Sequence, residues 1–217
     1  MSRCRAPLIA GLCYAIALCF PGLADAAPHA IAATPTTVAV YATVLRHYNP
    51  QLPDWQSKDL ARHLLTTAEH WKIDANMLAA IVTVESSWHT HALSSAGAIG
   101  LGQLMPGTAA TLGVNPRDPA SNLAGAAQYL RGLMQTFSTH PNRYALVFAA
   151  YNAGPKAVKE FGGIPPFEET QRYVVKVLST WHHLQASIHV PKTVLANAGK
   201  IAASGPDVDY WLNAERR

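Results

Sequence analysis

Apolar residues recur along this chain with the spacing of amphipathic helices. One clear stripe consists of Leu60, Leu64, Leu65 and Ala68, and it predicts a helix from residue 55 to about 71 with Asp54 as its N-cap. No stretch alternates apolar and polar residues over the length of a strand. The pattern therefore predicts an all-α protein whose helices are separated by glycine and proline.

Capping residues and turn residues set the bounds of the other predicted helices. Asp74 precedes one apolar run, and Asp118 precedes another with Pro119 at its first helical position. Asn152 to Pro155 ends a further run. The predicted helices cover residues 38–48, 55–71, 75–86, a short run ending at 112, 119–137, 143–151 and 168–184.

Four segments follow from this pattern. Residues 1–26 predict a secretory signal peptide, with Arg3 and Arg5 before an apolar stretch at 8–20 and a small-x-small cleavage pattern at 24–26; an uncleaved membrane anchor is the alternative. Residues 27–53 are rich in Ala, Thr and Pro, and we expect a loosely ordered leader there. Residues 54–185 form the folded domain, and residues 186–217 form a C-terminal tail.

Composition narrows the classes of protein that fit. With 49% hydrophobic and 14% charged residues the chain is globular, and its net charge of +4 selects no particular partner. All three cysteines lie in the first 26 residues, so the exported chain has no thiol nucleophile and no thiolate metal site. The close histidine pairs, at 89 and 91 and at 182 and 183, lack a carboxylate at ligand spacing, and no phosphate loop or nucleic-acid module is visible.

Glu85 is the candidate for chemistry. Leu78, Ile81, Val82 and Glu85 follow the i, i+3, i+4, i+7 spacing, so the carboxyl shares an otherwise apolar helix face. Burial disfavours its charged form, and we expect a raised pKa. An acid that keeps its proton near neutral pH is suited to protonating a glycosidic bond. Alternatively, Glu85 ends the helix and points into water.

The residues after Glu85 carry a motif. Glu-Ser-Ser-Trp begins at Glu85, Ser94 lies nine residues further on, and residues 100–106 read Gly-Leu-Gly-Gln-Leu-Met-Pro. This segment resembles the catalytic core of the soluble-type lytic transglycosylases, which share the goose-type lysozyme fold, and the blocks at 118–130, 149–155 and 169–174 agree in the same order. The resemblance covers residues 71–181. It implies an all-α, lysozyme-like (goose-type) single catalytic domain with an open glycan cleft.

One position departs from the family pattern. The family usually has Met before the Gln of this motif, where this chain has Gly102. We therefore expect looser packing against the sugar at that position, or a neighbouring side chain that fills the space.

The resemblance implies a reaction for Glu85. It would protonate the oxygen between N-acetylmuramic acid (MurNAc) and N-acetylglucosamine (GlcNAc), and then act as base toward the MurNAc 6-hydroxyl, which closes a 1,6-anhydro ring. One residue serves both steps, because its proton leaves in the first and returns in the second, so the usual second carboxylate is not required. The next carboxylate in the sequence is Asp118, in a cap context. No cofactor and no metal are implied.

The resemblance also assigns residues that would contact the substrate. Tyr151 matches the family tyrosine that approaches the catalytic carboxyl and can orient it, and a core tyrosine is the alternative. Ser94 and Gln103 match positions that contact sugar or its acetamido groups. Their simpler interpretations are a turn residue and a helix-start residue.

Three further residues complete the expected substrate site. Met105 matches a groove-lining position, with a core role as the alternative. Tyr173 lines the cleft or packs in the core. Asn152 is included, although we expect it to stabilise the turn before Gly154 more than to touch substrate.

Two other functions fit these motifs: a goose-type muramidase that uses water, and a non-catalytic peptidoglycan-binding scaffold. The expected partner is the peptidoglycan glycan strand. A further hypothesis adds components of a trans-envelope secretion or conjugation apparatus, which would contact residues 186–217. The predicted location is the periplasm, with no nucleic-acid partner and no stable membrane span after signal removal.

Overall fold

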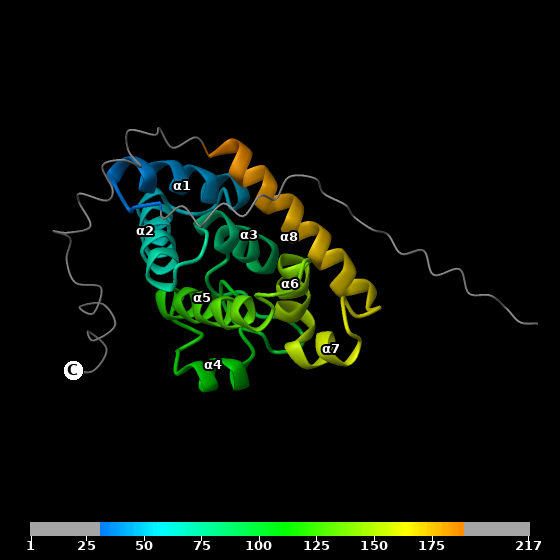
Figure 1. Ribbon diagram of the computed structural model, residues 1–217. Helices are drawn as coiled ribbons and strands as arrows, with labels where there is room; N and C mark the ends of the chain where they lie inside the picture. The colour runs from blue at the N-terminus through cyan, green and yellow to red at the C-terminus, as the bar shows by residue number, and fades with distance from the viewer. Residues whose placement is uncertain (1–30, 189–217) are drawn as a thin grey trace, which may run out of the picture.

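The computed structural model describes residues 31–188, and α-helices make up most of this part (Figure 1). The helices are α1 (Pro35–Tyr48), α2 (Asp54–Trp71), α3 (Ala75–Ser86), α4 (Pro106–Leu112), α5 (Pro119–Thr136), α6 (Arg143–Ala153), α7 (Pro155–Glu160) and α8 (Glu168–Ser187). Within residues 31–188, β-pairing is limited to isolated bridges of Ile99 with Leu93 and Leu104. The all-α prediction is therefore confirmed. The predicted signal peptide and residues 189–217 of the predicted tail lie outside the described residues.

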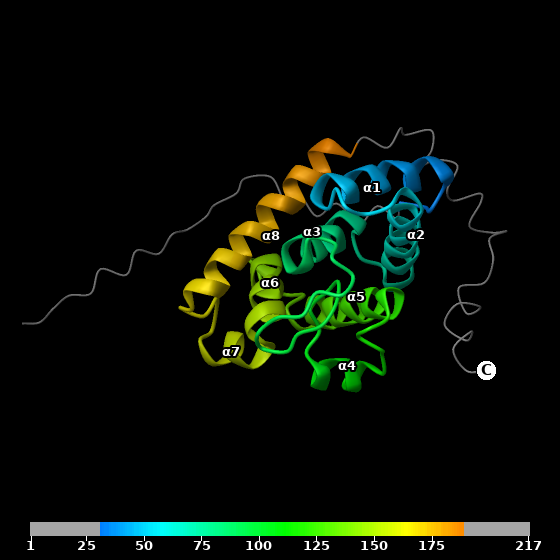
Figure 2. The same cartoon turned by 180° about the vertical axis from the view of Figure 1, so that it is seen from behind.

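Helix α3 is the centre around which the others pack. It contacts α2, α5 and α8, and it lies between its neighbours in the views from both sides (Figures 1 and 2). Ala80 lies away from the helix face that Leu78 and Ile81 share, yet all three side chains are fully buried. A helix that is apolar on all sides is a core helix. The sequence predicted only one of these faces, so α3 is buried more completely than expected.

Local capping chemistry sets the start of two helices as predicted. The Asp74 Oδ1 accepts a hydrogen bond of 2.8 Å from the Met77 N–H at the start of α3. The Asp118 Oδ1 accepts one of 2.7 Å from the Ser121 N–H at the start of α5. Each bond satisfies a backbone donor that has no partner within its own helix. Both predicted N-caps are confirmed.

Two helix starts differ from the prediction. Asp54 does not cap α2, because the helix begins at this residue and Pro53 takes the cap position without a side-chain hydrogen bond. Asp54 instead forms an exposed ion pair with Lys58 one turn further on. Further along the chain, α6 runs to Ala153 where the prediction ended it at residue 151. Pro155 then begins α7, a helix that was not predicted, because proline is well suited to the first turn of a helix.

The segment expected to be a loosely ordered leader is part of the packed domain from Pro35 onward. Tyr41 and Leu45 of α1 have no exposed surface, and α1 packs along α2. The Tyr41 hydroxyl donates a 2.8 Å hydrogen bond to the Asn76 Oδ1 of α3. The Ala-, Thr- and Pro-rich composition suggested weak order, but α1 still presents an apolar face to the core. Its packing brings the turn between α1 and α2 close to the end of α3.

Candidate active site

Glu85 lies in the last turn of α3, where its carboxyl meets α8. The side chain is half-buried, and the Tyr173 hydroxyl donates a 2.6 Å hydrogen bond to its Oε1. Burial raises the pKa of Glu85 to about 7; the Tyr173 hydrogen bond opposes the rise, and the charge of Glu169 adds to it. A carboxyl with this pKa can both hold and release a proton near neutral pH. The raised pKa agrees with the expectation from the apolar helix face.

Tyr173, rather than Tyr151, makes the hydrogen bond to the carboxyl. The Tyr151 hydroxyl donates instead to the Gly102 carbonyl oxygen at 2.9 Å, and its ring packs against that of Tyr129. In the structure the Tyr151 hydroxyl therefore bonds to the loop, although the charge of Glu85 still acts on it, and its role in orienting the acid stays a prediction. Burial, and then the charge of Glu85, raise the pKa of both Tyr151 and Tyr173 well above the usual range. Both hydroxyls consequently stay protonated and able to donate.

Glu169 is a site residue that begins the matched block at 169–174 but to which the sequence analysis gave no role. It lies four residues before Tyr173 on α8, and residues at this spacing share a helix face. Its position near Glu85 explains why its charge contributes to the raised pKa. The signal was present in the sequence as the Glu-Thr-x-x-Tyr spacing, but it became readable only once Tyr173 was placed against Glu85.

Asn152 ties α6 to α8 beside this carboxylate. Its Oδ1 accepts a 2.7 Å hydrogen bond from the Thr170 hydroxyl, and its Nδ2 donates to the Glu169 Oε1 at 3.4 Å. The expected role in the turn before Gly154 is thus replaced by a link between helices. Asn152 holds in place the part of α8 from which Glu169 and Tyr173 extend.

At Gly102 the backbone lies close against α5 and α6. A Cβ at this position would come within 2.5 Å of the Ala126 Cβ and 3.0 Å of the Tyr151 hydroxyl oxygen. The Gly102 N–H donates a 2.7 Å hydrogen bond to the Asn122 Oδ1. Neighbouring residues therefore fill the space that a side chain at position 102 would take, which was one of the two outcomes expected for this glycine.

Ser94 and Gln103 belong to the loop between α3 and α4. The Ser94 Oγ accepts a 2.9 Å hydrogen bond from the Ala98 N–H, which closes a turn. Gln103 has a left-handed backbone (φ 48°), and its Nε2 donates to the carbonyl oxygens of Gly100 at 2.9 Å and Ala92 at 3.3 Å. Both residues shape the loop, and both line the hollow beside Glu85.

Met105 is not a core residue. Its side chain is 45% exposed at the position before α4, so the alternative of a core role is wrong. An exposed thioether at the end of the Gln103 loop is free of the packing constraints of the core. Its contact with a sugar stays a prediction.

The backbone directly after Glu85 is strained. Ser87 and Trp88 both have positive φ angles, of 48° and 64°, which non-glycine residues rarely adopt. Trp88 is fully buried, and its Nε1–H donates a 3.0 Å hydrogen bond to the Thr83 Oγ1. The Asn49 Nδ2 donates to the Trp88 carbonyl oxygen at 3.2 Å. These contacts stabilise a costly conformation that turns the chain away from α3 and opens the space beside Glu85.

A hollow of about 780 Å³ lies beside Glu85. Its lining comes from the turn between α1 and α2, from Gln56 of α2, from the end of α3, from the loop over residues 87–94 and from Gln103. Glu85 is the only carboxylate among the lining residues. The hollow is therefore the space from which a ligand can reach the Glu85 carboxyl.

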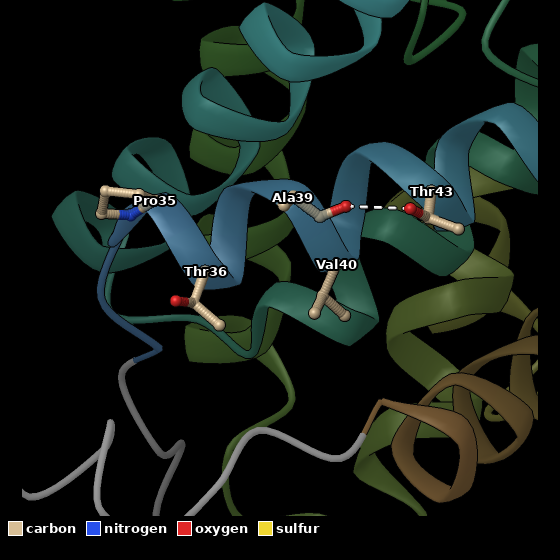
Figure 3. Close-up of a pocket in the computed structure, with 5 residues that line it drawn as sticks. All are labelled: Pro35, Thr36, Ala39, Val40 and Thr43. Carbon is tan, nitrogen blue, oxygen red and sulfur yellow. Dashed lines mark hydrogen bonds between the residues drawn. The ribbon is translucent and has the colours of Figure 1, made fainter.

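A second hollow lies on the outer side of α1 and has a different character (Figure 3). Only α1 lines it, through Pro35, Thr36, Ala39, Val40 and Thr43. The one dashed contact is the 3.0 Å hydrogen bond from the Thr43 hydroxyl to the Ala39 carbonyl oxygen, which lies within the helix (Figure 3). None of these side chains is an acid, a base or a strong nucleophile, so this hollow has no means for the chemistry that Glu85 can perform.

Residues 31–188 contain no group of three or more His, Cys, Asp or Glu side chains that could hold a metal ion. In the same range, none of the helices is long and apolar enough to cross a membrane. Of the histidines considered above, His89 and His91 lie in the lining of the hollow beside Glu85.

Comparison with known proteins gives one family match. Residues 64–174 match the family model described as the transglycosylase SLT domain. Among relatives, membrane-bound lytic murein transglycosylase F of Pseudomonas fluorescens Pf-5 is 32% identical over 52% of this chain and 23% of its own length. Membrane-bound lytic murein transglycosylase F 2 of Alkalilimnicola ehrlichii is 31% identical over 62% of this chain and 31% of its own length. The chain thus spans less than a third of these relatives.

Two solved structures share the arrangement of helices. An inactive Glu-to-Gln variant of lytic transglycosylase Slt from Pseudomonas aeruginosa superposes with a TM-score of 0.52 and 26% identity, over 67% of this chain and 30% of that one. The 70 kDa soluble lytic transglycosylase from Escherichia coli gives a TM-score of 0.51 and 26% identity, over 69% and 29%. These similarities confirm the predicted all-α, lysozyme-like fold class.

Proposed function

Because the chain belongs to the transglycosylase SLT domain family, we propose that it cleaves the glycan strands of bacterial peptidoglycan, with Glu85 as the single acid and base. One observation carries the proposal: a half-buried carboxyl with a pKa of about 7, hydrogen-bonded to Tyr173 and open to a hollow of the protein. The bond proposed to break is the β-1,4 bond between MurNAc and GlcNAc.

In the first step, protonated Glu85 donates its proton to the glycosidic oxygen. The bond between MurNAc C1 and that oxygen breaks, its electron pair stays with the departing GlcNAc, and positive charge develops at C1. Glu85 becomes a carboxylate as a result. The Tyr173 hydroxyl then stabilises the new charge through the 2.6 Å hydrogen bond, because bonds to ionised acceptors are stronger than those to neutral ones.

In the second step, the Glu85 carboxylate takes the proton of the MurNAc 6-hydroxyl while that oxygen attacks C1. A 1,6-anhydro ring closes, and Glu85 regains its proton. The two steps consume no water and leave the enzyme unchanged. The same carboxyl must therefore be a competent acid and a competent base, which requires a pKa near the working pH.

Hydrolysis is a second candidate, favoured by one observation. Glu169 lies close enough to Glu85 to raise its pKa, so a second carboxylate is available to activate water, as in glycosidases that use a pair of carboxylates. However, Glu169 accepts a hydrogen bond from the Asn152 Nδ2 and is exposed at the start of α8. We therefore favour an electrostatic role for Glu169.

Mass spectrometry of digested peptidoglycan tests the proposal. The protein should release muropeptides that are one water lighter than hydrolysis products, and Glu85→Gln should release none. Glu160→Gln is a matched control, because it makes the same change on an exposed carboxylate of α7. Products of full hydrolytic mass would establish a muramidase instead. Absence of product from folded protein that still binds peptidoglycan would favour a scaffold.

The place of action is also part of the proposal. The predicted signal peptide at residues 1–26 supports export, and the substrate lies outside the cytoplasmic membrane, so we place the enzyme in the periplasm. A role beside a secretion or conjugation apparatus stays a prediction from the sequence.

A further inference from the structure

The position of Glu85 depends on how α3 ends, because Glu85 is the second-to-last residue of this helix. Helix ends fray when little stabilises them. The chain leaves α3 through Ser87 and Trp88, two successive residues with positive φ angles of 48° and 64°. This conformation is costly for residues other than glycine. The turn therefore needs contacts from outside α3 if Glu85 is to keep its place beside Tyr173.

Asn49, the residue that ends α1, supplies such a contact. Its Nδ2 donates a 3.2 Å hydrogen bond to the Trp88 carbonyl oxygen, although the two residues are 39 positions apart. The Trp88 indole and the backbone N–H groups of Ser87 and His89 also donate hydrogen bonds, but these end on Thr83 or Ser86 of α3 itself. Asn49 thus ties the turn to another helix, whereas these bonds tie it only to the helix that it ends.

The two partners of the Asn49 amide fix its orientation. Its Oδ1 accepts a 3.1 Å hydrogen bond from the Gln51 N–H, which closes a turn of the Asx type. A backbone N–H only donates and a carbonyl oxygen only accepts, so the amide oxygen must face Gln51 and the amide nitrogen must face Trp88. Asn49 is only 5% exposed, and losing its donor would therefore leave the Trp88 carbonyl oxygen poorly solvated.

We propose that Asn49 is a positioning residue for the reaction at Glu85: it stabilises the turn that ends α3, and this turn keeps the Glu85 carboxyl against Tyr173. The inference rests on the proposed function and extends it to a part of the chain outside the family match, which begins at residue 64. Asn49 acts through the backbone of the turn and not through the substrate. The packing of α1 on α2 thus serves the active site as well as the core.

A double-mutant cycle tests the coupling between Asn49 and the turn. Asn49→Ala removes the donor, and Ser87→Gly removes the steric cost of one positive φ, so that the turn depends less on the donor. In the otherwise wild-type protein, Asn49→Ala should lower kcat on isolated peptidoglycan about tenfold, the effect of one buried hydrogen bond, with little change in KM. In Ser87→Gly protein, the same replacement should lower kcat by about threefold at most.

Asn115→Ala is the matched control. The Asn115 Oδ1 accepts the same kind of bond, from the Arg117 N–H at 3.0 Å, and neither residue lines the hollow beside Glu85. This variant should leave kcat unchanged in both backgrounds. An equal loss from Asn49→Ala in both backgrounds would mean that Asn49 acts on the substrate directly, which overturns the proposal. A lower Tm with unchanged kcat would show that Asn49 only stabilises the fold, which also overturns it.

Hydrogen exchange separates this proposal from the proposed function. Mass spectrometry follows deuterium uptake at the amides of Ser87 and His89, which donate to α3 while the turn is formed. Asn49→Ala should speed this uptake about tenfold in the otherwise wild-type protein and less in Ser87→Gly protein. Unchanged uptake in Asn49→Ala overturns the proposal whatever the activity. Failure of the proposed function appears separately, as wild-type protein that yields no anhydro product while uptake still depends on Asn49.

Discussion

Replacing Tyr173 with phenylalanine tests what sets the proton affinity of Glu85. The change removes one hydroxyl and its 2.6 Å hydrogen bond to the Glu85 Oε1, and it keeps the ring that packs between the helices. The Tyr173 hydroxyl donates to this oxygen, so the bond favours the carboxylate and lowers the pKa of Glu85. Without it, burial and the charge of Glu169 act unopposed, and the pKa must rise.

The size of the rise follows from the strength of the bond. Hydrogen bonds to charged groups contribute about 1.5–3 kcal/mol, and about 1.4 kcal/mol corresponds to one pKa unit. The pKa of Glu85 should therefore rise from about 7 to roughly 8 or above in Tyr173→Phe. The proposed reaction requires protonated Glu85 at its start, so activity in the wild type should decline as the pH rises through about 7.

The assay is the pH dependence of kcat/KM on isolated peptidoglycan. In Tyr173→Phe the alkaline decline should move to higher pH by about one unit, and the maximal rate should fall because the carboxylate formed in the first step loses its donor. Tyr48→Phe on α1 removes a hydroxyl that does not line the hollow beside Glu85 and should leave the profile unchanged. A decline that stays in place, or that moves to lower pH, would refute the assignment of Tyr173.

Other perturbations test the remaining contributions. Glu169→Gln removes a like charge, so the alkaline decline of kcat/KM should move to lower pH, opposite to Tyr173→Phe. As the pH rises from 4.5 to about 7, the unfolded chain loses the Glu85 proton before the folded protein does. The free energy of unfolding therefore falls by up to roughly 3 kcal/mol over this range. In urea unfolding, Glu85→Gln should be more stable than the wild type at pH 8 but not at pH 4. Gly102→Ala places a Cβ within 2.5 Å of the Ala126 Cβ and should cost about 1–3 kcal/mol, and calorimetry showing an unchanged Tm would contradict the tight packing. Asp74→Ala removes the N-cap of α3 and should cost about 1 kcal/mol in the same measurement, with Asp74→Asn nearly neutral.

Features that depend on a few neighbouring residues were predicted from the sequence. The caps at Asp74 and Asp118 were predicted correctly because each depends only on a hydrogen bond between a short side chain and the backbone N–H three residues later. The raised pKa of Glu85 was found for a similar reason, since the spacing of its apolar neighbours on one helix already implies burial. A helix at 38–48 was predicted, but its packing into the domain was missed, because the segment around it is rich in Ala, Thr and Pro and its packing partner lies on α2.

The partner of Glu85 could not be chosen from the sequence alone. Tyr151 and Tyr173 are both buried tyrosines on neighbouring helices, and the resemblance to the family favoured Tyr151. The hydrogen bond joins residues 88 positions apart, so the packing of α3 on α8 decides which hydroxyl reaches the carboxyl. The close approach of α5 to Gly102 directs Tyr151 to a backbone carbonyl instead. Local sequence patterns determine neither the distance from Tyr173 to Glu85 nor the distance from α5 to Gly102.

The single acid and base that we propose must meet two opposite demands, and the arrangement around Glu85 suits both. Burial alone would raise its pKa and make a good acid but a carboxylate too costly to form in the first step. The Tyr173 hydrogen bond lowers that cost because its donor, kept protonated by its own burial, is always present to meet the new charge. Glu169 acts in the other direction and prevents the bond from making the acid too strong. Because Tyr173 and Glu169 lie one turn apart on α8, the orientation of one helix sets both influences, and a change in the packing of α8 would alter the acid and the base together.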